Sequence, residues 1–207
     1  LETDRRRIRQ RIQAIRREIE HVRRERSTRR AARRRRDAPV VALVGYTNAG
    51  KSTLFNILSQ GGAVVSDQLF MTLDPLVRRV ALGGGREVLI VDTVGFIQKL
   101  PHALVAAFRA TLEEVVEADL LLHVVDASAW EPWAREAAVE RVLDEIGAGE
   151  RPCILVLNKI DRLPEARAEA LRRDRAGSVL VSARTGEGVE GLRDAMAARL
   201  ELETRRV

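Results

Sequence analysis

The sequence predicts a doubly wound α/β domain with a mostly parallel six-stranded sheet and helices on both faces. From Val40 onward, short runs rich in β-branched residues alternate with longer helical patterns. Several short runs, such as 120–122 and 154–157, are apolar at consecutive positions. Such strands are buried on both faces, which is typical of a parallel sheet between helix layers. Aromatic residues make up only 3% of the chain, so we expect aliphatic side chains to fill the core.

Six strands and five helices are expected after residue 38. The strands are predicted at Val40–Val44, Val77–Leu82, Glu87–Val91, Leu120–Val125, Ile154–Leu157 and Val179–Val181. The helices are predicted at Lys51–Leu58, His102–Glu117, Pro132–Ile146, Glu165–Arg173 and Gly188–Leu202. Three glycines at 83–85 predict a hairpin turn, so one edge strand should be antiparallel.

The first 37 residues differ in composition from the rest. They contain 16 arginines and six acidic residues, a net charge of +10, which leaves −4 for residues 38–207 out of a total of +6. Apolar residues at 1, 8, 12, 15, 19 and 22 follow a heptad pattern. We therefore predict an Arg-rich, coiled-coil-like helical arm at 1–37, the α/β domain at 38–202 and a tail at 203–207.

Composition limits the class of protein. A single cysteine among 207 residues excludes a disulfide framework and suits a reducing compartment. No apolar run is long enough to span a membrane, and the first residues are too charged for a signal peptide. We expect a cytoplasmic, monomeric protein without membrane contact. Because the chain starts at Leu1, we also expect further sequence upstream.

A phosphate-binding motif follows the first predicted strand and opens the first predicted helix. Residues 45–52 read GYTNAGKS and match G-x-x-x-x-G-K-[ST]. The backbone N–H groups of such a loop surround phosphate oxygens, the lysine reaches the β- and γ-phosphates, and the serine hydroxyl ligates Mg²⁺. Only three lysines occur in the chain, so a chance match is improbable. The predicted nucleotide contacts are Gly45, Tyr46, Thr47, Asn48, Ala49, Gly50, Lys51, Ser52 and Thr53.

A second motif ends the third predicted strand. Asp92 can hold Mg²⁺ from the tip of that strand, and Gly95 lets its backbone N–H approach the γ-phosphate. The D-x-x-G pattern is weak alone, but its position two strands after the phosphate loop strengthens it.

A third motif, Asn158-Lys-Ile-Asp161, follows the fifth predicted strand, at the sheet edge where open α/β sheets bind ligands. A carboxylate at Asp161 can accept both the ring N–H and the exocyclic amine of guanine. The stem of Lys159 can cover the base. Ser182 and Ala183, after the last strand, could add a backbone N–H to the guanine oxygen. The motifs together predict GTP or GDP as the ligand, and Asp161 makes an ATPase improbable.

The order and spacing of these motifs resemble those of the translation-factor-related P-loop GTPases, which implies a Ras-like G domain. The segments at 67–75, 92–97, 100–102, 107–114 and 1–6 are similar to the HflX family. The resemblance implies that Thr72 is the switch I threonine that ligates Mg²⁺ with Ser52 and Asp92. It implies catalytic roles for Lys51, Thr72 and Gly95. It also implies binding to the large ribosomal subunit in ribosome splitting or rescue, and an upstream domain that packs on the arm.

Two residues depart from, or add to, the general GTPase pattern. Phe96 stands where a glutamine would orient the attacking water, so we expect slow intrinsic hydrolysis. Asn48 is similar to a P-loop asparagine that helps to coordinate K⁺ in some GTPases lacking that glutamine. A purely structural role for Asn48 in the loop is equally consistent with the sequence.

Two alternative functions remain. One keeps the GTPase but places it in ribosome assembly or RNA modification. The other treats the chain mainly as an RNA-binding module in which the arginine-rich arm binds phosphate backbones and hydrolysis is secondary. The simplest interpretation of the arm is a solvated linker.

Overall fold

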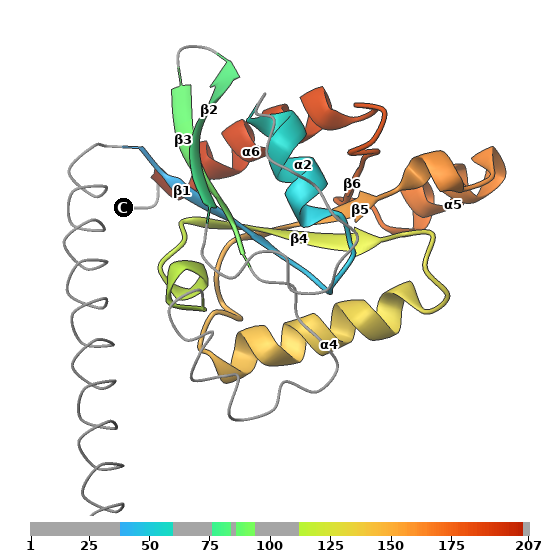
Figure 1. The fold of residues 1–207 in the computed structure, drawn as a ribbon, viewed down its shortest axis with the longest axis horizontal. Helices are drawn as coiled ribbons and strands as arrows, with labels where there is room; N and C mark the ends of the chain where they lie inside the picture. Colours follow the sequence, from blue (N-terminus) through green and yellow to red (C-terminus); the bar gives the residue numbers. More distant parts are fainter. Residues whose placement is uncertain (1–37, 60–75, 84–85, 94–111, 205–207) are drawn as a thin grey trace, which may run out of the picture. The chain divides into compact units, whose positions relative to one another are not determined.

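A computed structural model describes residues 38–59, 76–83, 86–93 and 112–204 (Figure 1). The chain divides into two compact units, Leu1–Ala38 and Pro39–Val207, and nearly all described residues lie in the second. The predicted arm at 1–37 lies outside the described residues, as does the predicted tail beyond residue 204. Both therefore remain predictions.

A six-stranded sheet with the strand order β2-β3-β1-β4-β5-β6 forms the centre of the second unit. Five of the strands are parallel, and β2 pairs antiparallel with β3 at one edge, as the glycine-rich turn predicted. The observed strands extend the predicted ones by a residue or so at most ends. They are β1 (Val40–Val44), β2 (Leu76–Gly83), β3 (Arg86–Asp92), β4 (Leu120–Asp126), β5 (Cys153–Asn158) and β6 (Val179–Leu180).

The helices also follow the prediction. They are α2 (Lys51–Leu58), α4 (Pro132–Glu145), α5 (Glu165–Asp174) and α6 (Val189–Thr204), with a short 3-10 helix η1 (Ile160–Arg162). The predicted helix at 102–117 is described only in its last part, where residues 112–116 are helical. Helix α6 runs two residues past its predicted end. No helix in the described part of the chain is both long and apolar enough to cross a membrane.

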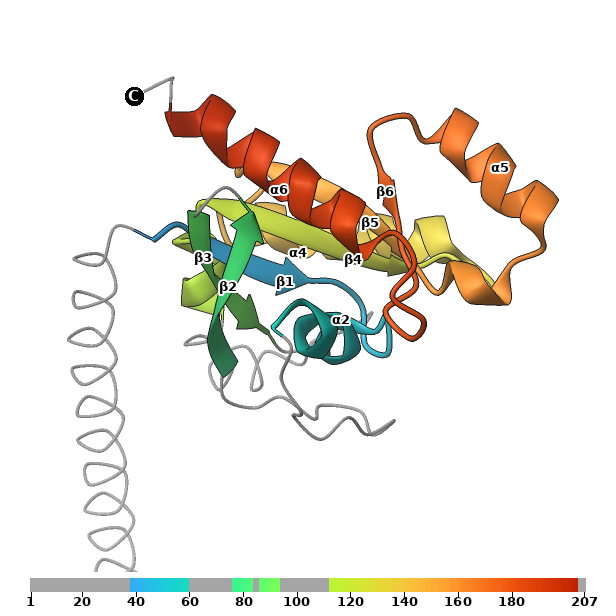
Figure 2. The same cartoon turned by 90° about the horizontal axis from the view of Figure 1, so that it is seen from above.

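Helices cover both faces of the sheet (Figures 1 and 2). Helices α2 and α6 pack on one face, where Phe55, Leu192 and Met196 join the larger core cluster with residues of the sheet. Helix α4 and the 112–118 segment cover the other face through Val115, Val139 and their neighbours. Strand β4 is buried along most of its length, which explains its uninterrupted apolar sequence.

The parallel arrangement brings the carboxyl ends of β1, β3, β4 and β5 to the same edge of the sheet. Each predicted nucleotide motif in the described residues directly follows one of these ends or that of β6. The topology therefore gathers segments that are more than 100 residues apart in sequence.

Arg193 on α6 connects three elements. Its guanidinium donates to the carbonyl of Leu58 at 2.9 Å and to the carbonyl of Ala81 at 2.7 Å. Helix α2 has no basic residue in its last turn, so Arg193 supplies a cation to its carboxyl end from another helix. The side chain is only 11% exposed, which strengthens both bonds.

We predict that Arg193→Met lowers the free energy of unfolding by about 2–3 kcal/mol, because the carbonyls of Leu58 and Ala81 both lose a charged donor. Urea unfolding of the two proteins measures the difference. Arg199→Met is the matched control, since Arg199 is exposed on the same helix. It should change stability by no more than about 0.5 kcal/mol. Equal losses in both variants would contradict the assignment.

Candidate functional site

The loop between β1 and α2 adopts backbone conformations that favour glycine and asparagine. Gly45 has φ +150°, and a Cβ atom there would lie 2.2 Å from the carbonyl oxygen of Val124. Gly50 has φ +94°, and its Cβ would lie 2.3 Å from Nδ2 of Asn158. Asn48 adopts the left-handed conformation at φ +58°, which asparagine tolerates better than most residues. The glycines of the motif are thus required by close contact with β4 and with the residue that ends β5.

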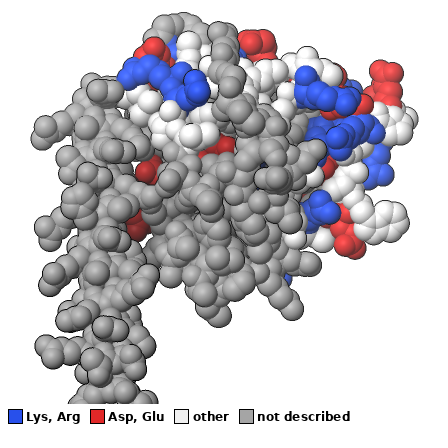
Figure 3. All heavy atoms as spheres, in the orientation of Figure 1, with Lys and Arg blue, Asp and Glu red and all other residues white. Residues whose placement is uncertain are grey.

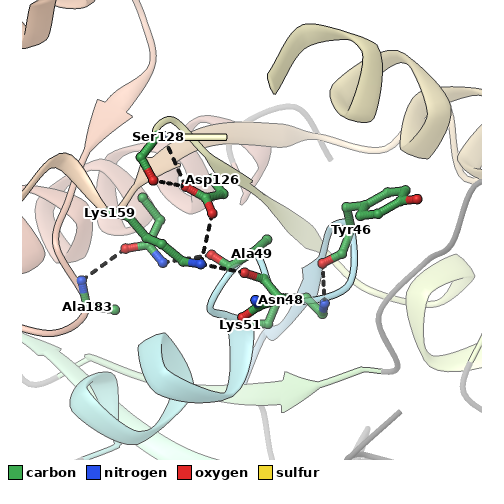
Figure 4. Close-up of polar contacts among 9 residues, drawn as sticks. Tyr46, Asn48, Ala49, Lys51, Asp126, Ser128, Lys159 and Ala183 are labelled. Atoms are coloured by element: carbon green, nitrogen blue, oxygen red, sulfur yellow. Dashed lines mark hydrogen bonds and ion pairs between the residues drawn. The ribbon is translucent and has the colours of Figure 1, made fainter. Parts of the chain in front are cut away.

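Lys51 lies buried at the start of α2. Its ammonium donates to the carbonyls of Gly45 and Tyr46 at 3.1 and 3.0 Å, so it lies within the loop (Figure 4). Burial lowers the pKa of Lys51 to about 8, although the nearby carboxylate of Asp92 opposes this shift. A desolvated cation surrounded by backbone carbonyls and N–H groups is suited to bind an anionic ligand.

Ser52 and Asp92 face each other from α2 and the end of β3. The serine hydroxyl donates to Oδ2 of Asp92 at 2.7 Å, and the carboxylate is fully buried. A hydroxyl and a carboxylate are the oxygen donors that Mg²⁺ prefers. The described residues contain no group of three or more His, Cys, Asp or Glu side chains that could hold a metal ion. This donor set fits a Mg²⁺ ion that takes its other ligands from phosphates or water.

Asn158 connects three predicted motifs. Its Nδ2 donates to the carbonyl of Ala49 at 2.8 Å, and its Oδ1 accepts from the N–H of Ala183 at 3.0 Å (Figure 4). The side chain is 1% exposed. One amide therefore holds the phosphate loop and the turn after β6 together. The N–H of Ala183, expected to reach a guanine oxygen, is already a donor within the protein, so that contact remains a prediction.

The carboxylate of Asp161 is held from two sides. Its Oδ1 accepts a hydrogen bond from Ser182 Oγ at 2.7 Å, and its Oδ2 forms an ion pair with Nη2 of Arg184 at 2.6 Å. The Asp161 side chain is 9% exposed, whereas that of Arg184 is 69% exposed. Ser182 thus orients the carboxylate, and the more exposed arginine holds the oxygen that a guanine edge would also use.

Asp126, at the end of β4, belongs to the site although its sequence pattern did not single it out. Its Oδ2 lies 2.8 Å from Nζ of Lys159, which also donates to the carbonyl of Asn48 at 2.7 Å. Its Oδ1 accepts from the N–H and the hydroxyl of Ser128. An Asp-x-Ser turn after a buried strand could have signalled this role, but such turns are common at strand ends.

Three residues singled out from the sequence lie outside the described residues: Thr72, Gly95 and Phe96. Their predicted roles in ligating Mg²⁺, binding the γ-phosphate and slowing hydrolysis remain predictions.

His123 is a buried polar residue in the middle of β4. No described residue hydrogen-bonds to its Nε2. Burial, and then the positive charge of Lys51, lower the pKa of His123 to about 4. The imidazole is therefore neutral at pH 7. The apolar strand pattern could predict burial but not the missing partner.

The comparisons with known proteins agree with this geometry. Residues 40–159 match the family described as 50S ribosome-binding GTPase. The "GTPase HflX" of Caldanaerobacter subterraneus subsp. tengcongensis is 49% identical over 204 residues, which cover 99% of this chain and 46% of the relative. The "GTPase HflX" of Escherichia coli K12 is 48% identical over 205 residues, covering 98% and 48%. The chain thus spans about half the length of the curated relatives it matches.

Solved structures show the same fold. A GTP-binding protein from the archaeon Sulfolobus solfataricus, crystallised with GDP, superposes with a TM-score of 0.62 and 26% identity. The match covers 87% of this chain and 58% of the archaeal one.

We predict that His123 makes the protein less stable in acid. The neutral imidazole has a folded pKa of about 4 against 6.5 when unfolded, so only the unfolded chain takes up this proton between those values. Stability should therefore fall as pH falls, by about 2 kcal/mol between pH 7 and pH 5 from this group. Urea unfolding at both pH values, compared with His123→Leu, isolates the effect. An identical pH dependence in the variant would contradict it.

Proposed function

This chain belongs to the 50S ribosome-binding GTPase family and, within it, to the HflX GTPases, and from that premise we propose a Mg²⁺-dependent switch that binds and hydrolyses GTP. We further propose that it associates with the large ribosomal subunit and acts in ribosome splitting or rescue. The nucleotide-binding part of the proposal rests on the two hydrogen bonds of the Asn158 side chain, which join the phosphate loop to the Ser182–Ala183 turn.

The phosphates would lie along the loop at 45–53. Lys51 is the buried cation nearest to them, and phosphate oxygens would replace the carbonyls of Gly45 and Tyr46 as its partners. The amino end of α2 would add its backbone N–H groups. Ser52 and Asp92, with Thr72, would hold Mg²⁺, which supplies charge neutralisation at the β- and γ-phosphates when bound. Gly95 would add its backbone N–H there.

The base would lie against Lys159 and Asp161. Asp161, oriented by Ser182, accepts two parallel N–H donors from guanine, and adenine offers no such pair. A guanine edge competes with Arg184 for Oδ2, so binding releases this exposed arginine. A site built around a buried acceptor rejects bases that leave it unpaired.

The charges visible on one face of the described domain bear on the alternative of an RNA-binding module. Basic and acidic side chains are interspersed over the described part of the face in Figure 3. Non-specific RNA binding needs a patch of one sign. The described part of this face shows no such patch, and in the alternative module the arginine-rich arm at 1–37 would bind the RNA. Deletion of residues 1–37 separates the two functions, since nucleotide-dependent ribosome binding should survive it if the switch regions carry it.

We predict that Asp161→Asn shifts base preference from guanine to xanthine. The amide can donate to the additional carbonyl of xanthine but no longer accepts two N–H groups. GDP affinity should fall by about 100-fold, and XDP should bind more tightly than GDP. Titration with fluorescent analogues of both nucleotides measures this.

Arg184→Ala is the matched control, because it leaves the carboxylate intact and should keep the preference for guanine. A variant at Asp161 that still prefers GDP would contradict the assignment of the base site.

We predict slow hydrolysis by the purified chain, on the order of 10⁻⁴ to 10⁻² s⁻¹, because Phe96 cannot orient water. Rapid turnover without any partner would contradict the role of Phe96.

If Asn48 helps to hold K⁺, hydrolysis should be faster in KCl than in NaCl, and Asn48→Ala should remove the difference. Equal rates in the two salts would exclude the K⁺ site.

The ribosomal role predicts nucleotide-dependent binding. Large subunits pelleted with the chain should carry more of it with a non-hydrolysable GTP analogue than with GDP, because the switch segments respond to the γ-phosphate. Equal pelleting in both nucleotides would count against the switch, and absence of pelleting would count against the subunit as partner.

A further inference from the structure

The pair formed by Asp126 and Lys159 is largely shielded from solvent at the point where the base motif meets the phosphate loop. The two side chains are only 12% and 15% exposed, and their charged atoms lie 2.8 Å apart. At that exposure the pair differs from ordinary surface ion pairs, because an unpaired charge there would be costly. The pair therefore needs both members.

Asp126 is held rigidly by its neighbours. It lies opposite Asn158 in the β4–β5 register, and the N–H of Ala127 donates to the carbonyl of Asn158 at 2.9 Å. Ser128 donates to its Oδ1 through its N–H at 3.0 Å and its hydroxyl at 2.6 Å. Burial raises the pKa of Asp126, but the bonds from Lys159 and Ser128 outweigh this effect and keep the pKa below its usual range. The carboxylate thus stays ionised and in place.

Lys159 connects Asp126 to the phosphate loop. Its Nζ donates to the carbonyl of Asn48 at 2.7 Å while Asn158 holds the next carbonyl, that of Ala49 (Figure 4). Lys159 and Asn48 both adopt left-handed backbone conformations, at φ +66° and +58°. Non-glycine residues keep such conformations only where their surroundings hold them. Two consecutive loop carbonyls are therefore bound by two consecutive residues of the base motif.

We propose that Asp126 is a positioning residue for guanine-nucleotide binding: its carboxylate keeps the Lys159 ammonium on the Asn48 carbonyl and so locks the base-binding turn onto the phosphate loop. The proposal rests on the proposed function, since it concerns the same nucleotide site. Without Asp126, the Lys159 ammonium loses its counter-ion and gains more from turning into water. The carbonyl of Asn48 then loses its donor, and the loop loses one of its two links to the base motif.

A double-mutant cycle tests whether Asp126 acts through Lys159. The variants are Asp126→Ala, Lys159→Met, which keeps most of the stem, and the double variant, all in the 207-residue chain. We expect each single change to weaken GDP binding by about tenfold or more and the double variant to resemble Lys159→Met alone. Fluorescent GDP titration and dissociation kinetics are the readouts. Additive losses in the cycle, or unchanged GDP binding in Asp126→Ala, would overturn the proposal.

Asp119, at the opposite end of β4, provides the control for a merely structural effect. Its Oδ2 accepts from the N–H of Val40 at 2.7 Å, far from the predicted nucleotide contacts. Asp119→Ala should lower the unfolding midpoint but leave GDP affinity within about twofold. An equal loss of GDP affinity there would also overturn the proposal. Asp126→Asn replaces Asp126→Ala in the cycle if the latter does not fold.

The outcomes also separate the two levels of inference. If the unaltered chain does not bind GDP, the proposed function fails and the role of Asp126 fails with it. If the chain binds GDP and the cycle is additive, only the role of Asp126 fails.

Discussion

The hydrogen bonds of the Asn158 amide are the interaction on which the rest of the site depends. A single buried side chain satisfies the carbonyl of Ala49 and the N–H of Ala183, which are more than 130 residues apart in sequence. Gly50 must be a glycine because Nδ2 of Asn158 occupies the space of a Cβ. The phosphate loop, the base motif and the turn after β6 are therefore adjusted to one another rather than placed separately on the sheet.

Pairs of oppositely charged side chains also contribute to this arrangement. The described site holds one buried and one partly buried lysine, and each has a carboxylate close by: Asp92 near Lys51 and Asp126 beside Lys159. The two pairs differ, since Lys159 contacts its carboxylate directly, whereas burial dominates at Lys51 and lowers its pKa to about 8. A desolvated cation gains the most from an incoming phosphate. The protein thus stabilises one lysine as part of its framework and leaves the other for the ligand.

Contacts away from the nucleotide motifs also hold this edge of the sheet in place. Arg193 joins the end of α2 to β2 and α6, so the helix that begins at the phosphate loop is held at its far end as well. Strand β4 carries both His123 and Asp126, and Leu121 and Leu122 pack toward opposite helix layers. Burial on both faces leaves β4 little freedom to move. The positions of Asp126 and of the neighbouring loops follow from that rigidity.

The amino-acid sequence by itself determined the fold class and the element order, and it predicts most of the nucleotide contacts. Those signals are local: consecutive apolar residues indicate strands between two helix layers, and the glycines, Lys51, Asn158 and Asp161 occur in short motifs with fixed spacing. Only the tertiary structure decided the contact of Asp126 with Lys159 and the ion pair of Arg184 with Asp161. It also decided that no described residue hydrogen-bonds to Nε2 of His123 and that Arg193 joins α2, β2 and α6. Each depends on side chains from separate strands or helices meeting at a particular distance, and no local pattern encodes such a distance. These side chains become buried and charged groups come close to one another only because the sheet brings the strand ends together.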